Sequence, residues 1–173
     1  LRVSPTIMVP ELMQAFNIEA VAIGSLSSTY LYAYALMQIP VGMLMDRFGA
    51  RKLLAIAAFI CGIGSIFFGM AQWLWMAELG RLCMGAGSAF AFIGMVYVCS
   101  HWFEPSKIAT LVGLGNSLGM LGAVFGEAPL SIAVKRHGWR LTMDFIGVVG
   151  IVYAIITLLV LRESNESAEK KDQ

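Results

Sequence analysis

The sequence is poor in charge and in the residues that carry catalysis. Asp, Glu, Lys and Arg make up only 13% of the 173 residues, the net charge is +1, and there are two histidines. Soluble domains carry about 25% charged residues, so this chain falls outside the usual composition of a soluble fold. The small net charge gives no polybasic footprint, and we expect no nucleic-acid partner.

Motifs that hold cofactors are missing as well. The three cysteines, Cys61, Cys83 and Cys99, stand in apolar runs and lack the spacing of a metal site or a disulfide framework. The sequence has no phosphate-binding loop and no nucleotide fingerprint. We therefore expect no cofactor, no ATP-driven step and no enzymatic activity.

What the chain has in excess is long apolar segments. Hydrophobic residues make up 58% of it, the mean hydropathy is +0.76, and runs long enough to cross a bilayer as helices recur along it. The predicted spans cover about residues 18–45, 53–71, 76–100, 108–134 and 141–161. Residues 1–10 are too short to span, and we interpret them as the outer part of a truncated first helix. The sequence thus predicts an all-α membrane bundle over residues 1–161, followed by a polar tail or linker at 162–173.

A charged hairpin at residues 42–52, here called the first hairpin, joins two of these spans. It places Asp46, Arg47, Arg51 and Lys52 within seven residues, and Gly49 allows the backbone a tight turn. Cytoplasmic loops of membrane proteins carry an excess of Lys and Arg. Seven basic residues fall on the side of this hairpin and three on the other. We therefore expect the hairpin and the tail to be cytoplasmic, in a multi-pass protein of the cell membrane.

A second hairpin, residues 135–140, repeats the first. The segments Arg47–Arg51 and Arg136–Arg140 share the pattern Arg-x-Gly-x-Arg, 89 residues apart. One follows the second predicted helix and the other follows the fifth, so an odd number of crossings separates them and they should lie on opposite faces. Two three-helix units of inverted topology are typical of secondary transporters.

These hairpins and their neighbours resemble a known family, the major facilitator superfamily of secondary transporters. The residues Gly42-x-Leu44-x-Asp46-Arg47-x-Gly49-x-Arg51 look like its signature loop, and Arg81-x-x-x-Gly85-x-Gly87 is similar to its fourth-helix pattern. The resemblance covers about residues 1–163 and implies an amino-terminal six-helix half built of two inverted three-helix repeats. It also implies a carboxy-terminal six-helix half as partner. A gating role is implied for the signature residues: Gly42, Asp46, Arg47, Gly49 and Arg51.

The function that this resemblance implies is transport of a small solute across the lipid bilayer by alternating access. We expect secondary active transport coupled to protons or another ion, with symport favoured. A drug-efflux antiporter is a less favoured alternative, because no proline follows Gly119, where the antiporter signature expects one. The rival from another class is a half-size membrane scaffold or receptor without transport activity.

Charged residues inside the predicted spans are the first candidates for a site. Ions within a membrane are costly, usually face an interior or an aqueous cavity, and often pair. Arg81 and Glu127 lie at equal depth, each about 30 Å from the cytoplasmic end of its helix. We predict that they pair and tune ion coupling; a purely structural ion pair near the outer interface is the alternative.

Candidates for solute binding lie on the first, second and fifth helices. Arg2 lies nearer the midplane, where a guanidinium can hold a carboxylate through two hydrogen bonds; pairing with another helix is the alternative. Tyr34 and Gln38 belong to a polar and aromatic stripe on one face of the second helix. Asn116 shares a face of the fifth helix with Glu127. Four tryptophans are expected to anchor the bundle at the membrane interfaces: Trp73, Trp75, Trp102 and Trp139.

Overall fold

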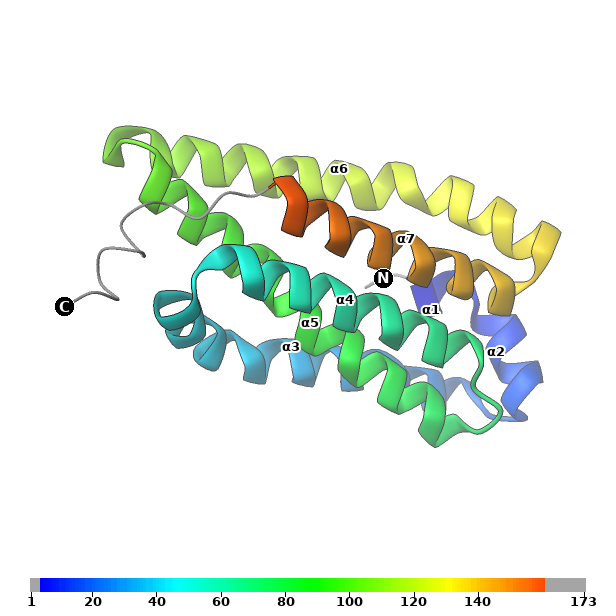
Figure 1. Cartoon of the computed structure of the whole chain (residues 1–173). Coiled ribbons are helices and arrows are strands. Elements are labelled where there is room, and N and C mark those ends of the chain that lie inside the picture. The colour runs from blue at the N-terminus through cyan, green and yellow to red at the C-terminus, as the bar shows by residue number, and fades with distance from the viewer. Residues whose placement is uncertain (1–3, 161–173) are drawn as a thin grey trace.

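The computed structural model describes residues 4–160, and all of their regular elements are α-helices (Figure 1). The helices are α1 (Ser4–Ile7), α2 (Val9–Phe16), α3 (Ala20–Phe48), α4 (Ala50–Gly69), α5 (Leu74–Trp102), α6 (Pro105–His137) and α7 (Trp139–Val160). Within this part of the chain, five helices, α3 to α7, are long and apolar enough to cross a membrane. The predicted all-α membrane fold is confirmed. Arg2 and the predicted tail at 162–173 lie outside the described residues.

A single glycine separates the helices at each hairpin. Gly49, between α3 and α4, has φ 78° and ψ 155°, and Gly138, between α6 and α7, has φ 81° and ψ 158°. A side chain would be strained in this region of backbone space, which glycine alone adopts readily. Both hairpins are therefore tight, because only one residue separates the second helix of each from the first.

The segment that precedes α3 is helical in two short pieces. The structure breaks the predicted partial helix at 1–10, because Met8 separates α1 from α2. Pro10 lies in the first turn of α2, where its missing N–H removes no helical hydrogen bond. Asn17 then ends α2 in the left-handed conformation, with φ 51° and ψ 51°. Together these pieces cap one end of the bundle.

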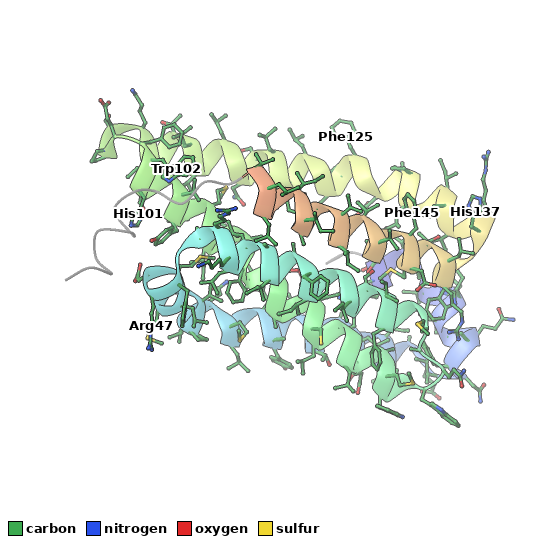
Figure 2. The ribbon with its side chains drawn as sticks, viewed as in Figure 1. Arg47, His101, Trp102, Phe125, His137 and Phe145 are labelled. Carbon is green, nitrogen blue, oxygen red and sulfur yellow. The ribbon has the colours of Figure 1, made fainter. Side chains whose placement is uncertain are left out.

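α4 lies at the centre of the long helices. It packs along α5 on one side and along α7 on the other, and α5 packs in turn along α3. α4 and α7 are antiparallel, since Arg51 at the start of α4 contacts Leu158 near the end of α7. α6 lies at the edge, and its most apolar stretch contains no buried residue. In Figure 2 the labelled Phe125 of α6 points away from the other helices, as a lipid-facing side chain would.

The two hairpins lie at opposite ends of the bundle. In Figure 1 the α3–α4 turn, the α5–α6 turn and the end of α7 gather at one end, and the α4–α5 loop and the α6–α7 turn gather at the other. Figure 2 places Arg47 and His101 at the first end and His137 at the second. The expectation that the repeated turn occurs on opposite faces agrees with this arrangement.

Trp139 departs from its expected place at the membrane interface. Its side chain is only 7% exposed, and its ring centroid lies 5.8 Å from those of both Phe16 and Phe68. It belongs to an apolar cluster to which all helices from α2 to α7 contribute, at the second-hairpin end. The prediction of interfacial anchoring is therefore wrong for Trp139, which is a core residue, whereas Trp73, Trp75 and Trp102 are exposed.

Candidate functional site

The first hairpin presents its charges at the end of the bundle. Asp46 and Arg47 are exposed in the last turn of α3, and the Arg47 guanidinium lies 5.4 Å from the centroid of the Phe48 ring. Gly42 lies one turn earlier, and a Cβ built on it would meet nothing within 4 Å. Asp46 and Arg47 are thus exposed at the end of α3, and Gly42 leaves free space one turn before them.

Arg51 is the member of the signature that contacts another helix. Its Nε and Nη2 donate hydrogen bonds to the carbonyl oxygen of Leu158, at 3.0 and 2.6 Å. Leu158 lies in the last turn of α7. Arg51 thus ties the start of α4 to the carboxy-terminal part of the described α7 through two charge-assisted hydrogen bonds.

Arg140 makes the equivalent contact at the other hairpin. Its Nη1 donates to the carbonyl oxygens of Gly69, at 3.2 Å, and Ala71, at 2.5 Å, where α4 ends. Sequence reasoning counted Arg140 only as a loop charge and missed this role. The sequence repeat could have indicated this role, because Arg140 is the counterpart of Arg51 at a distance of 89 residues.

Arg81 is fully buried between α5 and α3. Its Nε donates to the carbonyl oxygen of Leu26 at 3.3 Å, and its guanidinium lies 4.6 Å from the centroid of the Tyr30 ring. A charge at this depth is held by a carbonyl and an aromatic face, the kind of cation–π contact that strengthens when water is excluded. The close approach of the two helices is possible because a Cβ on Gly85 would meet the carbonyl oxygen of Tyr30.

The structure does not bring Arg81 and Glu127 together. Glu127 is exposed on α6, whereas Arg81 faces α3, and no ion pair joins these two described residues. The two helices turn these side chains toward different surroundings. The predicted pair is therefore absent from this conformation.

The proposed solute-binding residues are dispersed over two helices. Tyr34 is half-buried on α3 and stacks on Tyr30, with ring centroids 6.3 Å apart and planes inclined by 10°. Gln38 is exposed on α3, and Asn116 is exposed on α6. Arg2 lies outside the described residues. Tyr34, Gln38 and Asn116 are not among the residues that line the cavity between α4, α5 and α7.

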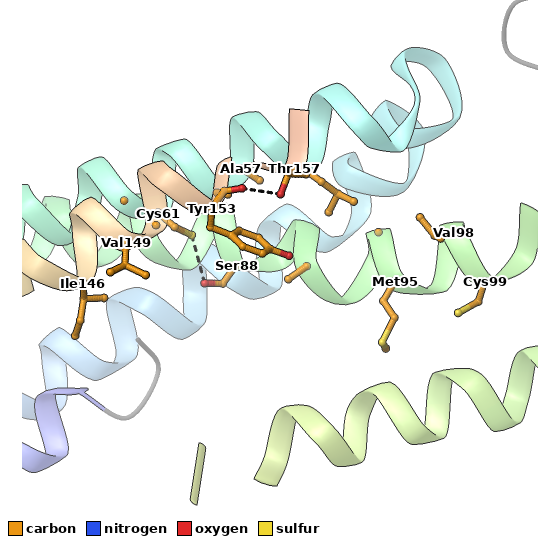
Figure 3. A pocket seen from close by; sticks show the side chains of 17 residues that line it. Ala57, Cys61, Ser88, Met95, Val98, Cys99, Ile146, Val149, Tyr153 and Thr157 are labelled. Carbon is orange, nitrogen blue, oxygen red and sulfur yellow. Dashed lines mark hydrogen bonds between the residues drawn. The ribbon is translucent and has the colours of Figure 1, made fainter. Parts of the chain in front are cut away.

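A cavity of about 620 Å³ lies elsewhere, between α4, α5 and α7 (Figure 3). Its lining is small and apolar, and its polar groups include Cys61 and Ser88, whose Sγ and Oγ atoms are 3.7 Å apart. Thr157, at its edge, donates from its own hydroxyl to the carbonyl oxygen of Tyr153 at 2.8 Å. A cavity of this chemistry has little to offer a charged solute. Across residues 4–160, no three His, Cys, Asp or Glu side chains lie close enough to hold a metal ion.

Comparison with known proteins places this arrangement in a family. Residues 2–173 match the model of the Major Facilitator Superfamily. The chain is 29% identical over 154 residues to the "Uncharacterized transporter YybO" of Bacillus subtilis (strain 168), an alignment covering 89% of this chain and 35% of that protein. It is 28% identical over 163 residues to the "Probable galactarate/D-glucarate transporter GudP" of Escherichia coli (strain K12), covering 90% of this chain and 36% of that protein.

A third relative has the same extent of similarity. The "Probable sulfoacetate transporter SauU" of Cupriavidus necator is 23% identical over 163 residues, covering 94% of this chain and 38% of its own length. The chain therefore spans little more than a third of each of these relatives. The match over nearly all of its residues, together with five spanning helices and paired inverted hairpins, shows that this chain belongs to the major facilitator superfamily.

Proposed function

We propose that the protein is the amino-terminal half of a secondary active transporter that moves a small organic anion across the cell membrane by alternating access. The observation that carries the proposal is the pair of matched hairpins at opposite ends of one helical bundle. Inverted three-helix units are the architecture in which a midplane site opens to either side in turn.

The anionic class of the solute rests on the relatives and on two arginines. One relative is named for sulfoacetate and another for galactarate and D-glucarate, and each of these solutes carries two acidic groups. This chain has Arg2 in its predicted partial first helix and Arg81 in a predicted span. A guanidinium binds carboxylate and sulfonate groups through parallel hydrogen bonds, and we assign the direct contact to Arg2. Tyr34, Gln38 and Asn116 add polar contacts once the other half closes around the solute.

Coupling to protons or another ion, with symport favoured, is assigned to Arg81 and Glu127. The pair that the conformation described here keeps apart would form in another state of the transport cycle. Replacing Glu127 with Gln removes the titratable group, so transport should lose its pH dependence; Glu104→Gln is the matched control, since Glu104 pairs with Lys107 at 3.2 Å on the bundle end. Unchanged rate and pH dependence in Glu127→Gln would rule out the coupling role.

We assign the cytoplasmic gate of the transporter to the first hairpin. Such a gate requires a second six-helix half to close against. Asp46 and Arg47 are exposed, and open space surrounds Gly42, so this surface is available for a second six-helix half. The basic residues of the hairpin favour a cytoplasmic position for it. In this arrangement the two halves close against each other when the transporter opens outward.

The apolar cavity is better explained as a packing site for another helix than as a solute-binding site. α5 packs on four residues of one face of α4: Ala57, Cys61, Gly64 and Phe68. Their counterparts 89 residues later are Ile146, Gly150, Tyr153 and Thr157, and all four line the cavity. By the repeat, the counterpart of α5 is the first helix of the other three-helix unit, so we propose that this helix fills the cavity.

A photocrosslinker placed in the full-length protein tests whether a helix packs in this cavity. Benzoylphenylalanine in place of Tyr153, which lines the cavity, should crosslink to another helix of the transporter, whereas the same label at Ile155, which does not line it, should crosslink to lipid. Crosslinking of both positions to lipid alone would contradict the assignment.

Uptake into proteoliposomes of the full-length protein tests the function itself. Radiolabelled galactarate, D-glucarate and sulfoacetate should accumulate when the outside is made acidic, and a neutral hexitol should not. Equal uptake of the hexitol would overturn the anion assignment. No uptake of any solute, from a protein that is folded and inserted, would favour the scaffold reading.

A further inference from the structure

Two arginine contacts join α4 to α7, and their geometry is reciprocal. Arg51, at the start of α4, binds the carbonyl oxygen of Leu158 at the end of α7. Arg140, at the start of α7, binds the carbonyl oxygens of Gly69 and Ala71 at the end of α4. Each helix therefore supplies the cation at its own beginning and the acceptor at its own end.

The register of these contacts matches the register of the sequence repeat. Arg140 follows Arg51 by 89 residues, and Leu158 follows Gly69 by the same 89 residues. Exchanging the two helices maps one contact onto the other, as a pseudo-two-fold axis requires. The acceptors belong to no sequence pattern, so their agreement is independent support for the repeat.

Both contacts place a guanidinium on backbone carbonyl oxygens of the neighbouring helix. At the end of α4, where Gly69 is the last helical residue, such carbonyls have no partner within the helix and carry the negative end of its dipole. A guanidinium satisfies them with charge-assisted hydrogen bonds, which are stronger than neutral ones. In a membrane protein such carbonyls have less access to water, so an unmade bond is more costly.

Between the two arginines, the helices already touch backbone to backbone. A Cβ on Gly62 would lie 2.8 Å from the carbonyl oxygen of Gly147, and a Cβ on Gly147 would lie 2.7 Å from that of Gly62. Ser65 adds a buried hydrogen bond from its hydroxyl to the carbonyl oxygen of Met143, at 2.9 Å. The contact thus extends from one end of the pair to the other.

We propose that Arg51 and Arg140 are paired clamps that hold α4 and α7 together as one rigid body, each acting at its own end. The Arg51 clamp also links the first hairpin to the last turn of α7, so that a shift of the hairpin moves the end of that helix with it. The proposal goes beyond the transport function and does not rest on the solute or on ion coupling.

Hydrogen–deuterium exchange on the full-length protein in nanodiscs tests each clamp separately. Arg51→Ala should speed amide exchange in the last turn of α7 by about tenfold, the usual effect of losing a hydrogen bond to a charged group, and leave the last turn of α4 unchanged. Arg140→Ala should give the reverse pattern. Arg51→Lys and Arg140→Lys, which keep the charge but not the fork of donors, should give intermediate rates.

The matched controls are the first arginine of each hairpin. Arg47 and Arg136 are exposed, so Arg47→Ala and Arg136→Ala remove the same charge from the same turn without touching the far helix. Rates in the clamp variants equal to those in these controls would overturn the proposal. A rise of equal size at both ends would overturn it too, because that result means general destabilisation.

A second measurement keeps the test independent of the folding of any clamp variant. Spin labels at Lys52 and Leu159, both exposed, report the separation of α4 and α7 at the Arg51 end. The labelled protein keeps both arginines, and its native cysteines are replaced. Pulsed electron resonance should give one narrow distance. Two resolved distances, or one broad distribution, would contradict a rigid pair.

Discussion

The first and second hairpins share a backbone but differ in their surroundings. Gly49 and Gly138 have nearly the same φ, and in each hairpin the second residue after the glycine is an arginine that binds the far helix. The charged residues of both turns are mostly exposed. The hairpins differ in the residue that follows the glycine. At the second, the buried Trp139 fills the position that Ala50 holds in the first.

A second difference lies one turn further along each helix. Asp144, on α7, buries its Oδ1 atom beside Gly69 without a hydrogen-bond partner, and its counterpart on α4 is Ala55. The features common to both hairpins, a glycine and an arginine, are those that the inverted fold requires. The features that differ, the buried Trp139 and the partly buried Asp144, occur at the second hairpin, where the first has alanines.

The largest effect that separates the two ends should come from Trp139. Trp139→Ala removes a buried ring from between Phe16 and Phe68 and should lower the free energy of unfolding by about 3–5 kcal/mol. Ala50→Gly, at the matching position, should cost less than about 1 kcal/mol. Thermal unfolding of the full-length protein in detergent measures both, and equal losses would mean that the ends are packed alike.

A smaller effect should be the same at both ends. Gly49→Ala and Gly138→Ala each place a side chain in a backbone region that suits glycine, at a cost of about 1–3 kcal/mol. A Cβ at either position meets nothing within 4 Å, so the loss comes from the backbone alone. The same unfolding experiment should give two similar shifts.

Gly42 supplies the control for this pair. A Cβ on it also meets open space, but Gly42 lies inside α3 with a helical backbone, so Gly42→Ala should be neutral or stabilise by about 0.5–1 kcal/mol. A loss at Gly42 as large as that at Gly49 would show that free volume, and not backbone conformation, sets the cost.

Much of the fold was predictable from the sequence because apolar length and turn chemistry are local properties. The spans follow from runs of apolar residues, and Gly49 and Gly138 mark turns whose conformation requires glycine. The sequence repeat also predicted that the two hairpins occur at opposite ends. Each of these inferences needs only residues that are neighbours along the chain.

The contacts between helices were not predictable in the same way. Counting residues along a helix estimates how deep Arg81 and Glu127 lie, but it does not give the rotation of helices that are apolar on nearly every side. Arg81 therefore turned out to face Leu26 and Tyr30. Trp139 was misjudged for a related reason, since a tryptophan next to a loop suits an interface as well as a core.

The smallest effect on stability should distinguish the two ends by function. Arg47→Ala and Arg136→Ala change exposed side chains and should each alter the free energy of unfolding by no more than about 0.5 kcal/mol. If the first hairpin forms the gate, Arg47→Ala should reduce solute uptake by the full-length transporter and Arg136→Ala should not. Equal uptake by both variants would remove the functional difference between the hairpins.

The central claim is that the two hairpins belong to inverted units on opposite sides of a membrane. Single cysteines at Arg47 and Arg136, in full-length protein whose Cys61, Cys83 and Cys99 are replaced, can be labelled with a membrane-impermeant maleimide in right-side-out and inside-out vesicles. The account predicts that the cysteine at 47 reacts only from the cytoplasmic side and the cysteine at 136 only from the outside. Labelling of both from the same side would contradict it.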